Sequence, residues 1–289
     1  MLSIQKILLP IDFQGASKSV VHQAAVLARQ FHSDILMLHV VTPLSFSAGA
    51  LEGGYVPVNL RDLYQELLRS AQKNLDALIG PELEGLSVKR ALIEGDPATT
   101  IVQTARDEKA SLIVMPTHGY GTFRRFLLGS VTAKVLHDSE CPVWTGAHLE
   151  EEPKREFALR NILCAVDLGA HSRKTVESAS QLASQFGARL TLAHITPVAE
   201  VYGPDGFDFG PDWKQKFASS AIQQIAKLQQ EIGTKAEVVV EGGDVPKVLD
   251  QVARQTNADV LVTGRPSHGR LRATGYSIIR ESHIPVLSI

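Results

Sequence analysis

Residues 111–131 read SLIVMPTHGYGTFRRFLLGSV, and this stretch decides the fold. Residues 111–115 are apolar enough for a buried strand, and a helical pattern follows over residues 131–137. Between them lies a loop punctuated by Gly119 and by Gly129-Ser130. Glycine lets the backbone approach a ligand, and a helix N-terminus carries partial positive charge, so a loop in this place favours phosphate. The stretch therefore predicts an α/β protein with a candidate nucleotide site.

The same pattern occurs twice along the chain. Residues 7–12 align with residues 162–167, and Cys141-Pro142-Val143 aligns with Ile284-Pro285-Val286. A repeat of this length is a whole domain. The charged, proline-containing stretch 150–156 indicates a linker, which predicts domains at residues 1–149 and 157–289. The second copy of the loop is shorter, and Arg272-Ala273 replaces the Gly-Ser pair.

Each copy alternates short apolar runs with amphipathic helical patterns. Runs rich in Ile, Leu and Val suit strands that are buried on both faces of a parallel sheet. The alternation predicts an open, doubly wound sheet with helices on both faces. The expected strands are residues 4–11, 34–41, 88–93, 111–115 and 142–145 in the first copy, and 161–166, 188–195, 236–241, 259–263 and 284–288 in the second.

Composition limits the class of protein. The 289 residues suit about two domains, and 44% hydrophobic with 21% charged residues is ordinary for a globular chain. A net charge of −2 argues against nucleic acid as the main partner, and no apolar run approaches the about 20 residues that span a bilayer. The N-terminus lacks a signal-peptide layout. The two cysteines, Cys141 and Cys164, are expected to be buried reduced thiols, so we expect a cytoplasmic protein.

Ligands of open α/β sheets bind outside the carboxyl ends of the strands. In the first copy Asp12 ends the first strand, Val40 ends the second, and residues 115–119 end the fourth. An aspartate there can accept hydrogen bonds from a ribose hydroxyl or a base amine. It can equally form a turn, since Asp167 repeats it beside the damaged loop. Ser130 can cap the following helix or donate its hydroxyl to a phosphate.

On these residues the chain resembles a tandem universal stress protein. That family places the motif Gly-x2-Gly-x9-Gly-(Ser/Thr) after its fourth strand. Gly119, nine residues and Gly129-Ser130 match it, whereas Pro116 occupies the first glycine position. The resemblance implies two five-stranded parallel sheets of the adenine nucleotide alpha hydrolase-like fold. It also implies the strand order 3-2-1-4-5 in each domain, and a pseudo-twofold pair of domains.

The resemblance further implies ATP, with adenine near Asp12 and Val40 and the phosphates at Gly119, Gly129 and Ser130. Whether Mg²⁺ accompanies ATP stays open, because no acid-rich cluster flanks the loop, and the histidines show no metal-ligand spacing. A Walker lysine is absent, so binding is favoured over fast catalysis, and a slow ATPase remains an alternative. The candidate nucleotide-binding residues are Pro10, Ile11, Asp12, Val40, Met115, Thr117, His118, Gly119, Gly129, Ser130 and Val131.

The damaged loop predicts that the second domain does not bind ATP and instead packs against the first. The final strands, residues 142–145 and 285–289, are the expected edges for that pairing. Whether chains pair further as a homodimer stays open. A ligand-free interaction module is the rival interpretation, and Pro116 supports it, because proline has no N–H to give a ligand.

Overall fold

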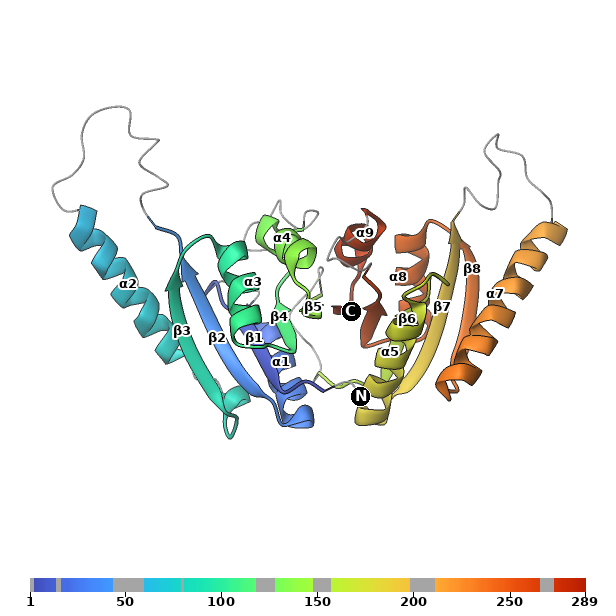
Figure 1. Ribbon diagram of the computed structural model, residues 1–289, viewed down its shortest axis with the longest axis horizontal. Helices are drawn as coiled ribbons and strands as arrows, with labels where there is room; N and C mark the ends of the chain where they lie inside the picture. The colour runs from blue at the N-terminus through green and yellow to red at the C-terminus, as the bar shows by residue number, and fades with distance from the viewer. Residues whose placement is uncertain are drawn as a thin grey trace, which may run out of the picture.

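One continuous ten-stranded sheet organises the molecule, in the order β3-β2-β1-β4-β5-β10-β9-β6-β7-β8 (Figure 1). The computed structural model describes residues 3–13, 17–43, 60–78, 81–117, 128–147, 157–197, 211–265 and 273–289. Within each half the strands are parallel, and their order is 3-2-1-4-5, as the family resemblance implies. The strands are β1 (Lys6–Pro10), β2 (Asp34–Val41), β3 (Val88–Glu94), β4 (Leu112–Met115), β5 (Val143–Thr145), β6 (Asn161–Ala165), β7 (Arg189–Pro197), β8 (Glu237–Gly243), β9 (Val260–Thr263) and β10 (Val286–Ser288).

Helices cover both faces of each half, which makes the fold doubly wound. Side chains of β1 alternate between two buried clusters, with Ile7 and Leu9 in one and Leu8 in the other. The first cluster packs against α1, α2, α5 and α7, and the second against α3, α4, α8 and α9. The helices are α1 (Ser17–Phe31), α2 (Leu60–Ala77), the short η3 (Pro81–Leu83), α3 (Pro97–Asp107), α4 (Ser130–Asp138), α5 (Ser172–Phe186), α7 (Pro211–Ile232), α8 (Val245–Gln255) and α9 (Ala273–Glu281).

The two halves meet where β5 pairs antiparallel with β10, so the strands expected as edges lie side by side. Leu287 pairs with Trp144, and Val286 pairs with Thr145, whose Oγ1 also donates to the Val286 carbonyl at 3.2 Å. Away from the sheet, the equivalent residues Phe31 and Phe186 of α1 and α5 meet edge to face, with ring centroids 6.0 Å apart. Contacts between equivalent residues are typical of a pair related by a pseudo-twofold axis.

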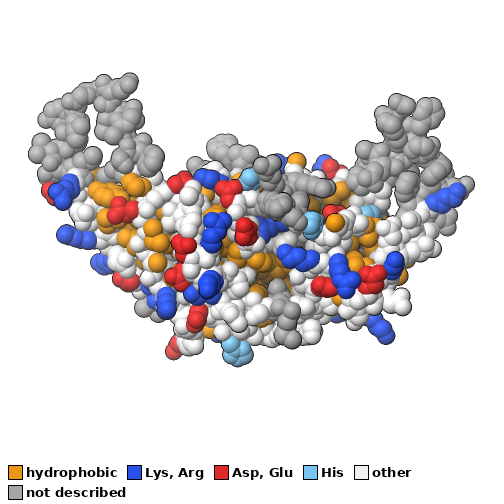
Figure 2. Space-filling view, viewed as in Figure 1, with side chains coloured by type: hydrophobic (Ala, Val, Ile, Leu, Met, Phe, Trp, Pro, Cys, Tyr) orange, Lys and Arg blue, Asp and Glu red, His pale blue; other side chains and the backbone are white. Residues whose placement is uncertain are grey.

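The outer end of the first half presents apolar surface. Hydrophobic side chains gather over α2 in the space-filling view (Figure 2). Leu63 and Leu67 of this helix are 59% and 46% exposed, whereas Leu75 near its end is buried in the core. The helix is therefore anchored to the sheet mainly by its C-terminal half.

Candidate functional site

The carboxyl ends of β1, β2 and β4 meet at one edge of the first half. β1 lies between the other two strands, with Pro10 opposite Leu38 and Leu8 opposite Ile113. The Ile11 amide extends this pairing by donating to the Leu38 carbonyl at 2.8 Å. The sheet register consequently brings Pro10, Ile11 and Asp12 beside the end of β2, which holds Val40, and near the end of β4, which holds Met115.

The ends of the glycine loop are tied together where β4 gives way to α4. The Gly129 amide donates to the Thr117 carbonyl at 2.8 Å, and Thr132 Oγ1 donates to the Pro116 carbonyl at 3.0 Å. Sequence analysis missed Thr132, whose hydroxyl bonds back to the strand from inside the helix. The start of α4 is thereby held over the end of β4. His118 and Gly119 lie outside the described residues.

The N-terminus of α4 has no side-chain cap in the described part of the chain. Gly129 is the N-cap residue, with φ −59° and ψ 141°, and as a glycine it has no side chain that could accept a hydrogen bond from the first turn. Ser130 is the first helical residue and is exposed, so the possibility that it caps the helix is not realised. Val131 is half-buried against the core. First-turn amides that no side chain caps can bind an anion.

The residues that follow Asp12 and Asp167 form the same tight corner in both halves. Phe13 and its counterpart Leu168 have φ values of 60° and 58°, the left-handed region that few side chains adopt. Asp167 forms a turn, which was one of the two roles that the sequence allowed for an aspartate at this place. Its Oδ1 accepts hydrogen bonds from the Gly169 amide at 2.9 Å and from Ser172 Oγ at 2.7 Å.

A histidine supports the corner of the first half. His39 Nδ1 lies 2.6 Å from the Ile11 carbonyl, and its ring packs on the Phe13 ring with centroids 4.3 Å apart. His194 makes the matching contact with the Val166 carbonyl at 2.8 Å. Both histidines brace the strand ends, and Asp12 is exposed beside the first of them.

The second half uses the matching edge for packing. β9 matches β4, so Gly264 takes the place of Pro116. A Cβ on Gly264 would lie 2.5 Å from Thr175 Oγ1, and its φ is not left-handed. Glycine is needed there for close approach to α5 and not for a positive φ.

Arg265 takes the place of Thr117, and its side chain is buried. Its guanidinium donates to the carbonyls of Ser139 at 3.0 Å and Leu136 at 3.3 Å, and also to that of Cys141. Burial lowers the pKa of Arg265. Sequence analysis missed this residue, because a lone arginine after a strand carries no signal of burial in another domain.

Both cysteines are free thiols, Cys164 buried and Cys141 half-buried. Burial raises the pKa of each to about 12, so both stay protonated at neutral pH and are poor nucleophiles. In the described ranges no cluster of three or more His, Cys, Asp or Glu side chains is arranged to hold a metal ion. No helix in those ranges has the length and hydropathy needed to cross a membrane.

The fold defines a duplicated, doubly wound α/β protein. The model of the universal stress protein family matches residues 3–145 and 158–289, so the chain belongs to this family and carries its domain twice.

Relatives match at full or half length. A universal stress protein of Mycolicibacterium smegmatis is 26% identical over 276 residues, which is 93% of this chain and 89% of that protein. Universal stress protein MJ0531 of Methanocaldococcus jannaschii is 30% identical over 154 residues, which is 53% of this chain and 85% of that protein. The crystal structure of a universal stress protein from Archaeoglobus fulgidus aligns with a TM-score of 0.71 at 21% identity, covering 100% of this chain and 97% of that one, and supports the fold.

Proposed function

We propose that the N-terminal domain, residues 1–149, binds one adenine nucleotide, with ATP as the expected ligand. The observation that carries the proposal is the start of α4, which hydrogen bonds tie to the end of β4 and which no described side chain caps. This helix end lies at the carboxyl edge of a doubly wound sheet, where such folds take their ligands.

Each part of this edge suits one part of the nucleotide. The exposed Asp12 carboxylate can accept hydrogen bonds from the base amine or the ribose, and the half-buried Val40 offers an apolar contact to the base. The amides of Gly129, Ser130 and Val131, with the Ser130 hydroxyl, suit the phosphates. Pro10, Ile11 and Met115 would shape the floor, and Thr117, His118 and Gly119 the loop side of the site.

The second domain, residues 157–289, is proposed to bind no ATP. Ala273 takes the place of Ser130 at the start of α9 and has no hydroxyl. Arg265 is occupied by carbonyl groups of the first domain. The expected stoichiometry is therefore one nucleotide per chain.

Calorimetric titration of the full chain with ATP, with and without Mg²⁺, tests the proposal. Ser130→Ala should weaken binding by about tenfold, the effect of losing one hydrogen bond to a charged group. Gly129→Val should weaken it further, because valine tolerates the observed φ and ψ but its side chain blocks close approach. The control is Thr274→Ala in the first turn of α9, an exposed position that should leave affinity unchanged. A stoichiometry of two, or binding insensitive to both first-domain variants, would contradict the assignment.

A ligand-free interaction module is the alternative favoured by Pro116, which removes a backbone donor at the loop. It predicts that gently purified protein carries no adenine nucleotide and that ATP does not raise its melting temperature. A slow ATPase would instead show turnover above background that Asp12→Asn abolishes.

A regulatory, cytoplasmic role accords with either binding outcome. Light scattering of the purified chain would establish whether it forms a homodimer.

A further inference from the structure

The turn after α4 and the turn after α9 are built alike. In each, a buried serine bridges to the residue two positions on. Ser139 Oγ donates to the Cys141 carbonyl at 3.2 Å and accepts from the Cys141 amide at 3.1 Å. Ser282 Oγ does the same with Ile284, at 2.8 Å and 3.3 Å. The local geometry of the two turns therefore comes from their own sequence.

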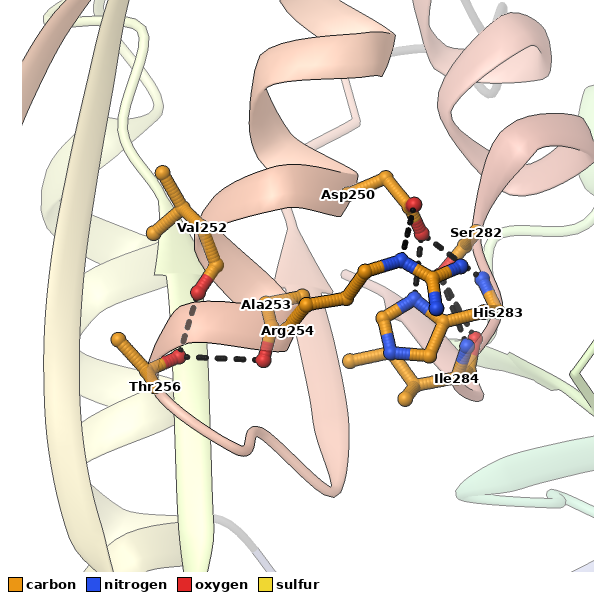
Figure 3. Close-up of polar contacts among 8 residues, drawn as sticks. All are labelled: Asp250, Val252, Ala253, Arg254, Thr256, Ser282, His283 and Ile284. Carbon is orange, nitrogen blue, oxygen red and sulfur yellow. Dashed lines mark hydrogen bonds and ion pairs between the residues drawn. The ribbon is translucent and has the colours of Figure 1, made fainter.

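The turn after α9 is braced from within its own domain (Figure 3). Asp250 of α8 accepts a hydrogen bond from the His283 amide at 3.1 Å, and its Oδ1 lies 2.5 Å from His283 Nδ1. The other carboxylate oxygen of Asp250 accepts from Arg254 Nε at 3.0 Å. These contacts hold the pKa of Asp250 below its usual value against the opposing effect of burial.

The turn after α4 is braced from the other domain. Arg265, 8% exposed, directs its two terminal nitrogens to the carbonyls of Leu136, Ser139 and Cys141. Carbonyls at a helix C-terminus carry partial negative charge, which stabilises a buried cation. Within the described residues the third nitrogen, Nε, has no hydrogen-bond partner, so the hydrogen bonds of this side chain all go to the last turn of α4 and the turn that follows it.

A second contact from the same domain reaches the middle of α4. Tyr276 of α9 donates its hydroxyl to the Ala133 carbonyl at 3.4 Å. The start of α4, by contrast, is held within its own domain, through Gly129 and Thr132. A helix of nine residues is too short to absorb a shift at one end without moving the other.

We infer that Arg265 is an interdomain positioning residue, which holds the C-terminal end of α4 from the second domain and so aligns the start of α4 with the end of β4. The second-domain residue that matches Thr117 thus holds the C-terminal end of α4. The predicted effect of Arg265 on nucleotide affinity rests on the proposed function. The predicted effect of Arg265 on the order of α4 is independent of the proposed function.

Hydrogen exchange followed by mass spectrometry tests the inference without any ligand. Arg265→Met keeps an unbranched apolar stem, two atoms shorter than the arginine side chain, and removes every donor. Exchange in residues 133–141 should speed up roughly tenfold, as expected when hydrogen bonds to a charged group are lost, while residues 276–284 keep the wild-type rate. Arg265→Lys should lie between the two and serves as the main variant if methionine prevents folding. The control is Arg173→Met, because Arg173 is an exposed residue paired with Glu177 and Glu231.

Affinity provides the second readout, measured well below the melting temperature of each variant. Arg265→Met should weaken ATP binding roughly three- to tenfold, and Arg173→Met should not. Exchange in residues 133–141 that matches the wild type, or that rises equally across both domains, would overturn the inference, because a purely stabilising residue gives one of those results. A wild-type chain that binds no ATP would refute the proposed function and leave the exchange result to decide the role of Arg265.

Discussion

Asp96 shows how one carboxylate sets the start of a helix beside the candidate site. It is the N-cap of α3, and its Oδ1 accepts from the Thr99 amide at 3.0 Å and from Lys134 Nζ at 3.2 Å. Hydrogen bonds from Thr99, and then from Lys134, lower the pKa of Asp96 to about 2 from its usual 3.8. Because the folded pKa is depressed, the stabilisation is present above about pH 4 and is lost as the pH falls from there toward 2.

Asp96→Ala should lower the free energy of unfolding by about 1 kcal/mol at pH 7, the usual effect of losing an N-cap. The difference from the wild type should shrink as the pH falls toward 2. Asp96→Asn should retain most of the stability, because asparagine also caps helices and the ion pair with Lys134 is exposed and weak. Urea unfolding of the three proteins across this pH range checks the prediction, and a constant difference between Asp96→Ala and the wild type would refute it.

Gly264 is a position where an added Cβ atom would collide with a buried side chain. Thr175, against which a Cβ would collide, is buried, and its Oγ1 donates to the His171 carbonyl at 3.1 Å. Since this hydroxyl cannot turn away without losing its partner, Gly264→Ala should destabilise the fold by about 1–3 kcal/mol. The double variant Gly264→Ala, Thr175→Ala should recover part of the loss in thermal melts. Equal melting temperatures for the single and double variants would show that the collision is not the cause.

Most elements could be predicted from the sequence, because a strand that is buried on both faces appears in the sequence as a short, continuous apolar run. Ile7, Leu8 and Leu9 are consecutive and all fully buried, which gives the apolar run of β1. The ends of strands are less evident in the sequence than the strands themselves. The last strand begins at Val286 and not at residue 284, because Ser282 holds Ile284 in a turn.

The candidate site was predictable only in part. Chain order and spacing place Asp12, Val40 and Ser130 at strand ends and at a helix start, which is local information. Spacing cannot distinguish an N-cap from the first helical residue, so the place of Ser130 in the first turn could not be predicted from the sequence. The role of Arg265 could not be predicted either, since its partners lie 124–129 residues away in the chain. Long-range polar contacts depend on how the two halves pack, which periodicity does not encode.

At the scale of the whole molecule, the two domains share one core. Both buried clusters contain residues of both halves, so the apolar core continues across the β5–β10 seam. Trp144 lies at this seam, fully buried, with Nε1 donating to Gln23 Oε1 of α1 at 2.7 Å. Its ring meets that of Phe157 edge to face, at 6.1 Å between centroids. Its fluorescence therefore reports on first-domain packing and on the pairing of the domains together.

We predict that the two domains unfold in one transition, although chains longer than about 150 residues often unfold through intermediates. Separating the domains would expose Trp144 and the apolar faces of β5 and β10 to water, and that cost couples them. Trp213→Phe leaves Trp144 as the single tryptophan. The red shift of its emission in urea should then coincide with the loss of helical circular dichroism. A red shift at lower urea than the loss of helix would mean that the domains part while still folded, and that the seam is a contact between two independent units.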